Sequence, residues 1–302
     1  MVSFNEILAQ ASSKKEVTVA VVMAEDLEVL SAIEKACSYE LANFILIGDE
    51  QKIDELIAAH FTSLMETGRI VTRHAANHSE AAQKGVRAVS EGEASVLMKG
   101  HIETAPLLKA VLHKEYGLRT GNVLSHVALF EVPSLKRSIF VTDAAMNVAP
   151  DLHQKVQIVH NAVAIAQSIG VTEPKVAPLA AVEVVNPSMQ ATLDAASLTQ
   201  MNRRGQIKGC VIDGPLALDI AVSEEAARHK KIGGEVAGQA DILLVPTIEA
   251  GNILYKSLMY FGMSQVGAVI AGAKAPIVLT SRADSAESKL NSLALAICSS
   301  NN

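Results

Sequence analysis

The sequence has little of what several large classes of protein require. Its 302 residues carry 26 Lys and Arg against 32 Asp and Glu, for a formal net charge of −6. Binding to a nucleic-acid backbone depends on clustered basic surface, so this balance argues against a nucleic-acid binder. The three cysteines, Cys37, Cys210 and Cys298, are far apart and show no metal-ligand spacing. Neither a disulfide framework nor a zinc site is predicted, and a reducing cytoplasm is the natural setting.

Long apolar runs are also scarce. The longest, VGAVIAGAKAPIVLT at 266–280, is interrupted by Lys274 and Pro276 and is short for a membrane span. The N-terminus carries Glu6 and lacks a basic segment followed by an apolar core, which is the pattern of a signal peptide. We therefore expect a cytoplasmic protein with no membrane segment.

Common cofactor motifs are missing as well. There is no G-x-x-x-x-G-K-[ST] phosphate loop and no H-E-x-x-H, and the glycine-rich segment KIGGEVAGQAD at 231–241 precedes an apolar run instead of following one. His74 and His78 are four residues apart, but Asn77 and Ser79 make a helix start the favoured interpretation of that segment. These motifs indicate neither a metal site nor a dinucleotide-binding loop.

What the sequence does contain is an alternation of short apolar runs with longer helical patterns. VTVAVVMAE (17–25), NFILIGD (43–49), RIVTRHA (69–75) and ASVLMKG (94–100) are each followed by a helical pattern. The runs are continuous, without apolar-polar alternation, which is typical of strands buried on both faces of a mainly parallel sheet. The fold class predicted is α/β.

The pattern changes briefly after residue 122. Pro133 and Ser134, followed by Lys136 and Arg137, indicate a turn between two consecutive strands, the second being SIFVTD at 138–143. The alternation of strands and helices then resumes. The change of pattern predicts a domain boundary near residue 129. A chain of this length suits two modest domains or one large one.

In open parallel sheets, ligands bind at the carboxyl ends of the strands, so the residues that follow each strand are candidates. They are Lys99, Gly100, His101 and Thr104; Asp143 and Asn147; Asp213; Glu249, Gly251, Asn252 and Lys256; and Ser281 with Arg282. Taken singly, most have an ordinary structural explanation: Thr104 opens a helix, Asp213 begins a turn, and Asp284 with Glu287 has capping-box spacing.

Lys99, Lys256 and Arg282 together indicate more. Cations at strand ends, beside glycines and helix N-termini, favour an anion and phosphate above all. The residues alone therefore predict a two-domain α/β protein with an anion-binding cleft, and they do not identify a reaction.

Five segments resemble the phosphate acetyl/butyryltransferase family, and its butyryl branch most closely. They are VLMKGHIETAPLLKAVL (96–112), FVTDAAMN (140–147), VIDGPLALDIA (211–221), VAGQADILLVPTIEAGNILYKSL (236–258) and PIVLTSRADSAESKL (276–290). The resemblance implies the architecture of isocitrate and isopropylmalate dehydrogenases, in which two α/β domains flank a cleft. The first domain is then expected to comprise 1–128 plus 272–302, and the second 129–271, through which subunits pair as a homodimer.

The reaction that the resemblance implies is reversible transfer of a butyryl or similar acyl group between coenzyme A and phosphate. A thiolate attacks the acyl phosphate directly in a ternary complex, and the acyl phosphate can feed an acyl kinase. Coenzyme A and phosphate are substrates, so no bound cofactor and no metal is implied. Because aromatic residues make up only 3% of the chain, an acyl pocket is expected to be aliphatic.

The family's motifs also imply residue roles. Arg282 is expected to bind phosphate and stabilise developing charge, and Ser281 to position the thiol or the carbonyl oxygen. The acetyl branch has an Asp as the base seven residues after this Ser; here that position is Ser288, so Glu287 is the candidate base, with Asp284 as its alternative. The remaining binding candidates are Lys99, Gly100, Thr104, Asp143, Asn147, Asp213, Gly251, Asn252, Lys256 and Asp284.

Three alternatives stay open at this stage. The first is a phosphate acetyltransferase. The second is a metal-dependent hydroxyacid dehydrogenase of the same architecture, for which Asp143, Asp213 and Asp219 would have to converge on a divalent ion. The third is a non-catalytic acyl-CoA-binding subunit, because the acidic residue expected at position 288 is missing.

Overall fold

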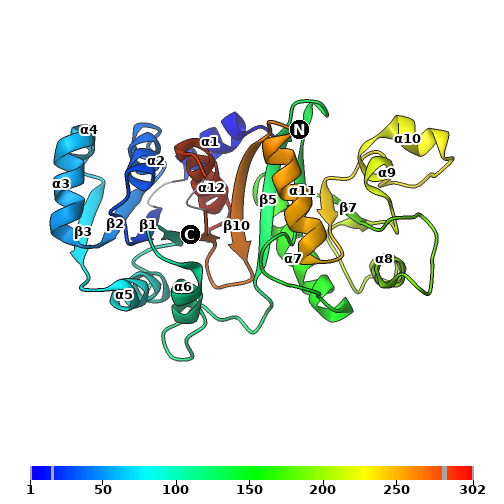
Figure 1. Cartoon of the computed structure of the whole chain (residues 1–302), viewed down its shortest axis with the longest axis horizontal. Helices are drawn as coiled ribbons and strands as arrows, with labels where there is room; N and C mark the ends of the chain where they lie inside the picture. The colour runs from blue at the N-terminus through cyan, green and yellow to red at the C-terminus, as the bar shows by residue number, and fades with distance from the viewer. Residues whose placement is uncertain (1, 15–16, 281–283, 301–302) are drawn as a thin grey trace. The chain divides into compact units, whose positions relative to one another are not determined.

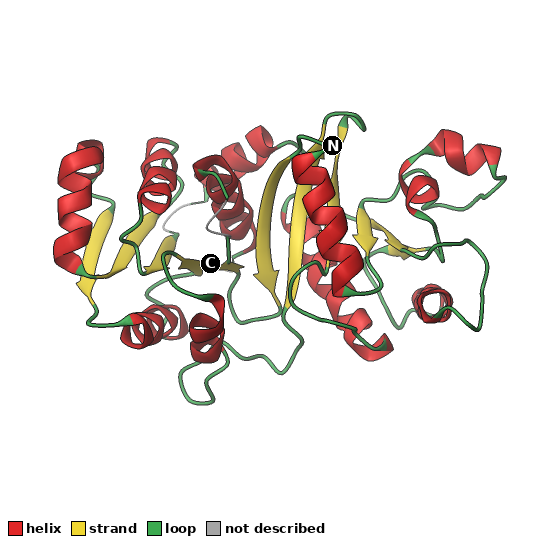
Figure 2. Ribbon diagram, in the orientation of Figure 1, coloured by secondary structure: helices red, strands yellow, loops and turns green. Residues whose placement is uncertain are grey.

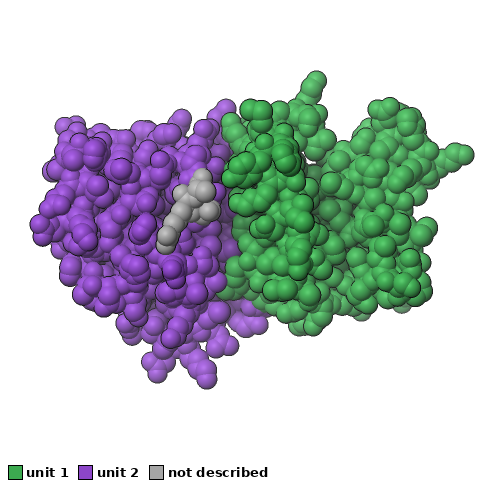
Figure 3. Space-filling view, viewed as in Figure 1, with its two compact units in different colours: residues 1–3, 123–266 green, residues 4–122, 267–302 purple. Residues whose placement is uncertain are grey.

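The computed structural model describes residues 2–14, 17–280 and 284–300. The chain divides into two compact units, which are coloured separately in Figure 3. Unit 1 comprises residues 1–3 and 123–266, and unit 2 comprises residues 4–122 and 267–302. The boundaries that the family resemblance implies, 128/129 and 271/272, lie within about a strand's length of these positions. Each unit is an α/β fold, as the sequence predicts.

Unit 2 is built on a mostly parallel sheet in the order β3-β2-β1-β4-β11-β10 (Figure 1). The strands are β1 (Thr18–Val22), β2 (Asn43–Gly48), β3 (Ile70–His74), β4 (Val96–Lys99), β11 (Ile277–Val278) and β10 (Gln265–Ala271), most of which lies in this unit. All the pairings from β3 to β11 are parallel, and β10 pairs with β11 antiparallel. The alternation of strand and helix read from the sequence accounts for the parallel part.

The burial of these strands follows their place in the sheet. β1, β2 and β4 are buried along nearly their whole length, as their continuous apolar runs predict. The prediction was wrong for β3, whose residues are half-buried or exposed, with Val71 59% exposed. β3 is the edge strand and has a neighbour on one side only, so less of its surface is covered.

Helices cover both faces of the unit 2 sheet (Figures 1 and 2). α5 (His78–Ser90) packs with α6 (Thr104–Val111) on one side, and α12 (Ala286–Ser299) packs with α1 (Phe4–Ser13) and α2 (Leu27–Ser38) on the other. The remaining helices are α3 (Glu50–His60) and α4 (Thr62–Glu66). Side-chain caps start four of these helices: Asp26 for α2, Asp49 for α3, Ser285 for α12 and, as predicted, Asn77 for α5.

Unit 1 has the strand order β5-β6-β9-β7-β8. β5 (Ser125–Val132) and β6 (Arg137–Thr142) form an antiparallel hairpin, joined by the turn that the sequence predicts at Pro133 to Lys136. β9 (Ile242–Leu244), β7 (Lys175–Pro178) and β8 (Val211–Ile212) continue the sheet in parallel. The helices are α7 (Leu152–Ser168), α8 (Gln190–Arg203), α9 (Leu218–Val222), α10 (Glu224–His229) and α11 (Ile248–Tyr260).

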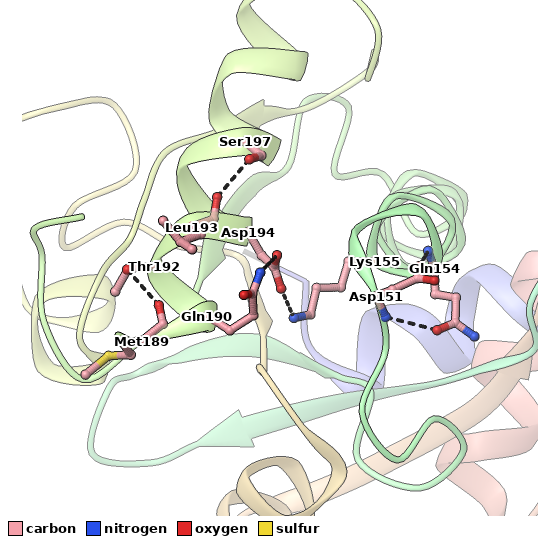
Figure 4. Close-up of polar contacts among 9 residues, drawn as sticks. All are labelled: Asp151, Gln154, Lys155, Met189, Gln190, Thr192, Leu193, Asp194 and Ser197. Atoms are coloured by element: carbon pink, nitrogen blue, oxygen red, sulfur yellow. Dashed lines mark hydrogen bonds and ion pairs between the residues drawn. The ribbon is translucent and has the colours of Figure 1, made fainter. Parts of the chain in front are cut away.

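The start of α7 is fixed by a reciprocal capping box. The Asp151 carboxylate accepts from the backbone N–H of Gln154 at 2.8 Å, and the Gln154 side chain accepts from the backbone N–H of Asp151 at 3.0 Å. The next residue, Lys155, reaches across to Asp194 on α8 (Figure 4). The cap therefore sets both the start of α7 and the direction in which Lys155 points.

Among the described residues, no helix combines the length and the apolar composition that crossing a lipid bilayer requires.

Candidate functional site

The carboxyl edge of the unit 2 sheet brings together two of the segments that the sequence singled out. β4 ends at Lys99 and pairs in parallel with β11, so their carboxyl ends lie side by side. The Lys99 side chain is buried, and its ammonium lies 3.4 Å from the carbonyl oxygens of Gly100 and of Thr280. A buried cation is thus located where the strand-end rule predicts an anion site.

Gly100 is required by a close approach of two backbones. Its N–H donates to the carbonyl of Val22 at 2.8 Å, and a Cβ at this position would overlap the carbonyl oxygen of Met23. The following N–H, of His101, donates to the same Met23 carbonyl at 2.6 Å. No side chain fits here without moving backbone, so Gly100 holds the ends of β1 and β4 together.

Thr104 begins α6, as expected, but it is the first helical residue and not the cap. Glu103 occupies the N-cap position and makes no side-chain capping hydrogen bond. The explanation of Thr104 by capping alone is therefore wrong, and its half-buried side chain is left for another role.

Ser281 and Arg282 lie outside the described residues, which resume at Asp284. α12 starts one residue later than the capping-box spacing of Asp284 and Glu287 suggested. Ser285 is the N-cap, and its hydroxyl accepts from the backbone N–H of Ser288 at 3.2 Å. Glu287 sits exposed in the first turn. The interpretation of Glu287 as a capping residue is wrong, because Ser285 already fills that role.

In unit 1, Asp143 follows β6 and its carboxylate organises the loop after the strand. One oxygen accepts from the backbone N–H groups of Ala145 and Met146, each at 3.0 Å. The other accepts from the backbone N–H of Asn147 at 3.1 Å and from its side-chain amide at 2.5 Å. Asn147 also donates to the carbonyl of Leu124 at 2.8 Å. The structure brings Asp143 and Asn147 into contact, and these hydrogen bonds give them a role in shaping the loop.

α11 packs directly on the same loop through Gly251. A Cβ at Gly251 would lie 2.7 Å from the carbonyl oxygen of Asp143 and 2.9 Å from the Cα of Ala144. The helix therefore sits closer to the loop than any residue with a side chain would allow. Asn252, the residue after Gly251, and Lys256 are exposed and four residues apart, which places them on one face of α11.

Asp213 is separate from this group. It follows β8, which lies three strands away from β6 in the sheet, or about 14 Å at the usual strand spacing. Burial raises the pKa of the Asp213 carboxyl, and the Arg203 guanidinium, 3.7 Å away, opposes that rise. Asp213, Asp143 and Asp219 make no shared cluster, and within residues 2–14, 17–280 and 284–300 no three acidic, His or Cys side chains are placed to hold a metal ion.

The cysteines are poorly suited to nucleophilic chemistry. Cys37, Cys210 and Cys298 are all buried, and burial raises the pKa of each thiol to about 11. At neutral pH such thiols stay protonated, whereas the thiolate is the nucleophile.

Sequence reasoning missed two buried lysines. Lys155 on α7 is paired with Asp194, and Lys289 on α12 donates to the carbonyl of Asp284. A signal was present in the helical periodicity: Lys155 shares a stripe with Val159, Ala162 and Ala166, all of which are buried. A charged residue in the apolar stripe of a helix indicates a buried charge.

A family model and full-length relatives of this chain all describe phosphate acyltransferases. A family model described as phosphate acetyl/butaryl transferase matches residues 54–297. A probable phosphate butyryltransferase of Bacillus subtilis (strain 168) is 57% identical over 98% of this chain and 97% of its own length. A phosphate butyryltransferase of Clostridium acetobutylicum is 51% identical over 97% of each chain.

A solved structure with the same fold is also a phosphotransacylase. The crystal structure of a branched-chain phosphotransacylase from Enterococcus faecalis V583 has 38% sequence identity and a TM-score of 0.83, over 94% of this chain and 98% of that one.

Proposed function

Because this chain belongs to the phosphate acetyl/butyryltransferase family, we propose that it moves a butyryl or similar short or branched acyl group between coenzyme A and phosphate. The observation that carries the proposal is near-full-length identity to butyryltransferases, at 57% and 51%, together with the fold shared with a branched-chain phosphotransacylase. The enzyme is an acyltransferase, with coenzyme A and phosphate as substrates.

The reaction proceeds by direct transfer. A phosphate oxygen attacks the thioester carbonyl carbon, the C–S bond breaks, and the thiolate of coenzyme A leaves and takes up a proton. In reverse, the thiolate attacks the acyl phosphate and phosphate leaves. The three buried cysteines support transfer without an acyl-enzyme, since protonated and buried thiols are poor nucleophiles.

Arg282 and Ser281 are proposed to act at the carboxyl edge of the unit 2 sheet. The residue before their segment supports this placement: Thr280 lies against the ammonium of Lys99, where a parallel sheet offers its ligand-binding edge. Arg282 holds the phosphate and the charge that develops on the tetrahedral oxyanion, and Ser281 orients the thioester.

Glu287 is proposed as the general base that takes the thiol proton. A free thiol has a pKa near 8.5, so a modest base is sufficient. Support comes from the start of α12, where Ser285 is the N-cap and leaves the exposed Glu287 carboxylate without a capping role.

On unit 1, Lys256 and Asn252 are proposed to bind a phosphate or coenzyme A group from their exposed positions on α11. Asp143, Asn147 and Gly251 contribute by holding the loop and the helix in place.

A homodimer formed through unit 1 is also proposed, because α11 and the turn after it expose Ile253, Tyr260, Phe261 and Met263. The acyl phosphate product suits a kinase that transfers its phosphoryl group to a nucleotide.

The test is a free-thiol assay with butyryl-CoA, with and without inorganic phosphate, in the absence of metal and nicotinamide. Phosphate-dependent release of thiol is expected. Repeating the assay with acetyl, isobutyryl and valeryl thioesters ranks the acyl pocket, and a preference for acetyl would make the enzyme a phosphate acetyltransferase. Binding of coenzyme A without turnover by any thioester, in folded protein, would overturn catalysis and favour an acyl-CoA-binding subunit.

A further inference from the structure

Two residues on one side of α11 pack on the sheet of unit 1. Of the thirteen residues of this helix, all of which the structure describes, Gly251 alone is buried. Tyr255 follows four positions later, so the two lie on the same side of the helix. Gly251 packs on the loop after β6, and the Tyr255 ring packs on β5. Both contacts hold α11 over the hairpin of β5 and β6 (Figure 1).

The Tyr255 ring is held by two aromatic rings of β5. Its centroid lies 5.6 Å from that of His126 and 5.1 Å from that of Phe130, with interplanar angles of 64° and 72°. These are edge-to-face arrangements, which aromatic pairs prefer. His126 and Phe130 are buried and four residues apart, so they lie on one face of β5. Together they fix the position and the tilt of the Tyr255 ring.

The contact with His126 places Tyr255 at the carboxyl edge of the unit 1 sheet. β5 runs antiparallel to β6, and the hydroxyl of Thr142, the last residue of β6, donates to the carbonyl of His126 at 2.8 Å. Asp143 and its loop follow directly. Tyr255 therefore packs beside the strand end from which the Asp143 loop begins, and mainly parallel sheets bind their ligands at this edge.

The next residue, Lys256, has its ammonium over the Tyr255 ring. Nζ lies 5.4 Å from the ring centroid, within the range of a cation–π interaction. Lys256 is exposed, and within the described residues its ammonium forms no ion pair with a carboxylate. A lysine side chain in water has many rotamers and loses entropy when it is held in one of them. The ring is the group that restricts where this charge lies.

We propose that Tyr255 is a positioning residue of the acyltransferase: its ring, fixed by His126 and Phe130, holds the ammonium of Lys256 in place for a phosphate group of the substrate. That group belongs to inorganic phosphate or to coenzyme A, and KM values for the two substrates distinguish them. The inference rests on the proposed function, which assigns anion binding to Lys256. If the ring served only to pack α11 on the sheet, an apolar side chain of similar volume would replace it.

Two substitutions separate positioning from packing. Tyr255→Phe keeps the ring, and Tyr255→Leu keeps an apolar side chain without a ring. We expect Tyr255→Leu to raise KM for the substrate that Lys256 binds about two- to fivefold, the usual effect of a cation–π interaction at an exposed site. Turnover should change by less than about twofold, because the contact acts on binding and not on the chemical step. Tyr255→Phe should change neither. Normal KM values in folded Tyr255→Leu would overturn the proposal.

A double-mutant cycle with Lys256→Met shows whether Tyr255 acts through the lysine. In the Lys256→Met background, Tyr255→Leu should leave both KM values unchanged, because no ammonium remains to be held. An equal rise in both backgrounds would overturn the proposal and leave Tyr255 as a packing residue. Unchanged KM values in Lys256→Met itself would also overturn it, while phosphate-dependent release of thiol would still establish the reaction.

Tyr116→Leu is the matched control. Arg87 lies over the Tyr116 ring in unit 2, 4.9 Å from its centroid, so this variant removes the same kind of contact from a place with no proposed role in binding. We expect both KM values to stay unchanged. A rise similar to that of Tyr255→Leu would overturn the proposal, because the effect would not depend on Lys256.

An NMR measurement keeps the test independent of turnover. Reductive methylation with ¹³C-formaldehyde labels the lysines and keeps their charge. The Lys256 signal, identified by its loss in Lys256→Met, should be shifted upfield by the ring current of Tyr255, and Tyr255→Leu should lose that shift. Inorganic phosphate or coenzyme A should move the same signal. If no thioester turned over while these shifts were observed, the proposed reaction would fail and the assignment of Tyr255 would stand. An unshifted Lys256 signal in an active enzyme would refute the assignment.

Discussion

The ammonium of Lys155 lies 2.5 Å from Oδ2 of Asp194, in an ion pair that joins α7 to α8 inside unit 1 (Figure 4). The other oxygen of Asp194 accepts from the Gln190 side chain at 2.8 Å. Leu198 of α8 and Val245, just after β9, line the same small cavity. The two side chains are only 7% and 9% exposed, so the pair is shielded from water and each charge depends on the other.

Removing one member of this pair should destabilise the protein strongly. We expect Asp194→Ala to lower the free energy of unfolding by about 3–5 kcal/mol, because Lys155 is left as a buried charge without a partner. The double variant Lys155→Met, Asp194→Ala removes both charges and should recover most of that loss. Urea denaturation of the four proteins in the cycle measures the coupling, and a loss below about 1 kcal/mol in Asp194→Ala would show that the pair is not effectively buried.

The contact between Gly251 and the Asp143 loop makes a second prediction. In Gly251→Ala, the new Cβ lies 2.7 Å from the Asp143 carbonyl oxygen, so α11 must move. We expect a loss of about 1–3 kcal/mol in stability and reduced turnover, since Asn252 and Lys256 move with the helix. Gly233→Ala is the control, because a Cβ there meets no atom within 4 Å. Chemical denaturation and the thiol assay, run on both variants, provide the comparison.

Arg282→Ala tests the proposed charge stabilisation. We expect turnover to fall roughly 10²-fold or more, the usual effect of losing one donor to a developing oxyanion. Arg204→Ala, which removes an exposed arginine from the turn after α8, should leave turnover unchanged. Near-normal turnover by folded Arg282→Ala would remove this arginine from the mechanism.

Glu287→Gln tests the base. Turnover should fall while the free energy of unfolding stays within about 0.5 kcal/mol, because Ser285 and not Glu287 caps α12. Ser285→Ala should cost about 1 kcal/mol in stability, as the loss of an N-cap does. The thiol assay and thermal unfolding measure the two effects, and normal turnover in Glu287→Gln would exclude it as the base.

The cysteines predict how the protein behaves with thiol reagents. Because burial raises the pKa of all three thiols to about 11, the thiolate fraction at pH 8 is about 10⁻³. We expect no reaction of the native protein with a disulfide reagent at pH 8 over minutes, and three equivalents after denaturation in urea. Rapid labelling of the native protein would contradict the burial of these side chains. The same property keeps the protein's own thiols out of the coenzyme A assay.

Much of the architecture could be read from local pattern. Continuous apolar runs identified the buried strands β1, β2 and β4. The turn residues at Pro133 and Ser134 identified the antiparallel hairpin of β5 and β6. Asn77 was identified as a helix cap from its neighbours alone. Such features depend on residues a few positions apart, so the physical constraint is already present in the linear sequence.

The candidate residues were identified individually, but their grouping was not. Asp143 and Gly251 are 108 positions apart, and nothing in either segment indicates that a carbonyl of one lies against the Cα of the other. The predicted N-cap of α12 was Asp284, and the structure has Ser285, one residue later. Asp and Ser are both good N-caps, so the local sequence does not distinguish the two positions.

The buried lysines show most clearly which properties the local sequence determines and which depend on tertiary packing. Composition and periodicity determine that this chain forms buried parallel strands covered by amphipathic helices, because those preferences are local and repeat along the chain. Whether a lysine in an apolar stripe finds a carboxylate, as Lys155 does, or only a carbonyl, as Lys289 does, depends on which helices and loops pack together. Electrostatic compensation is a property of neighbours in space, and it arises only once the units have folded.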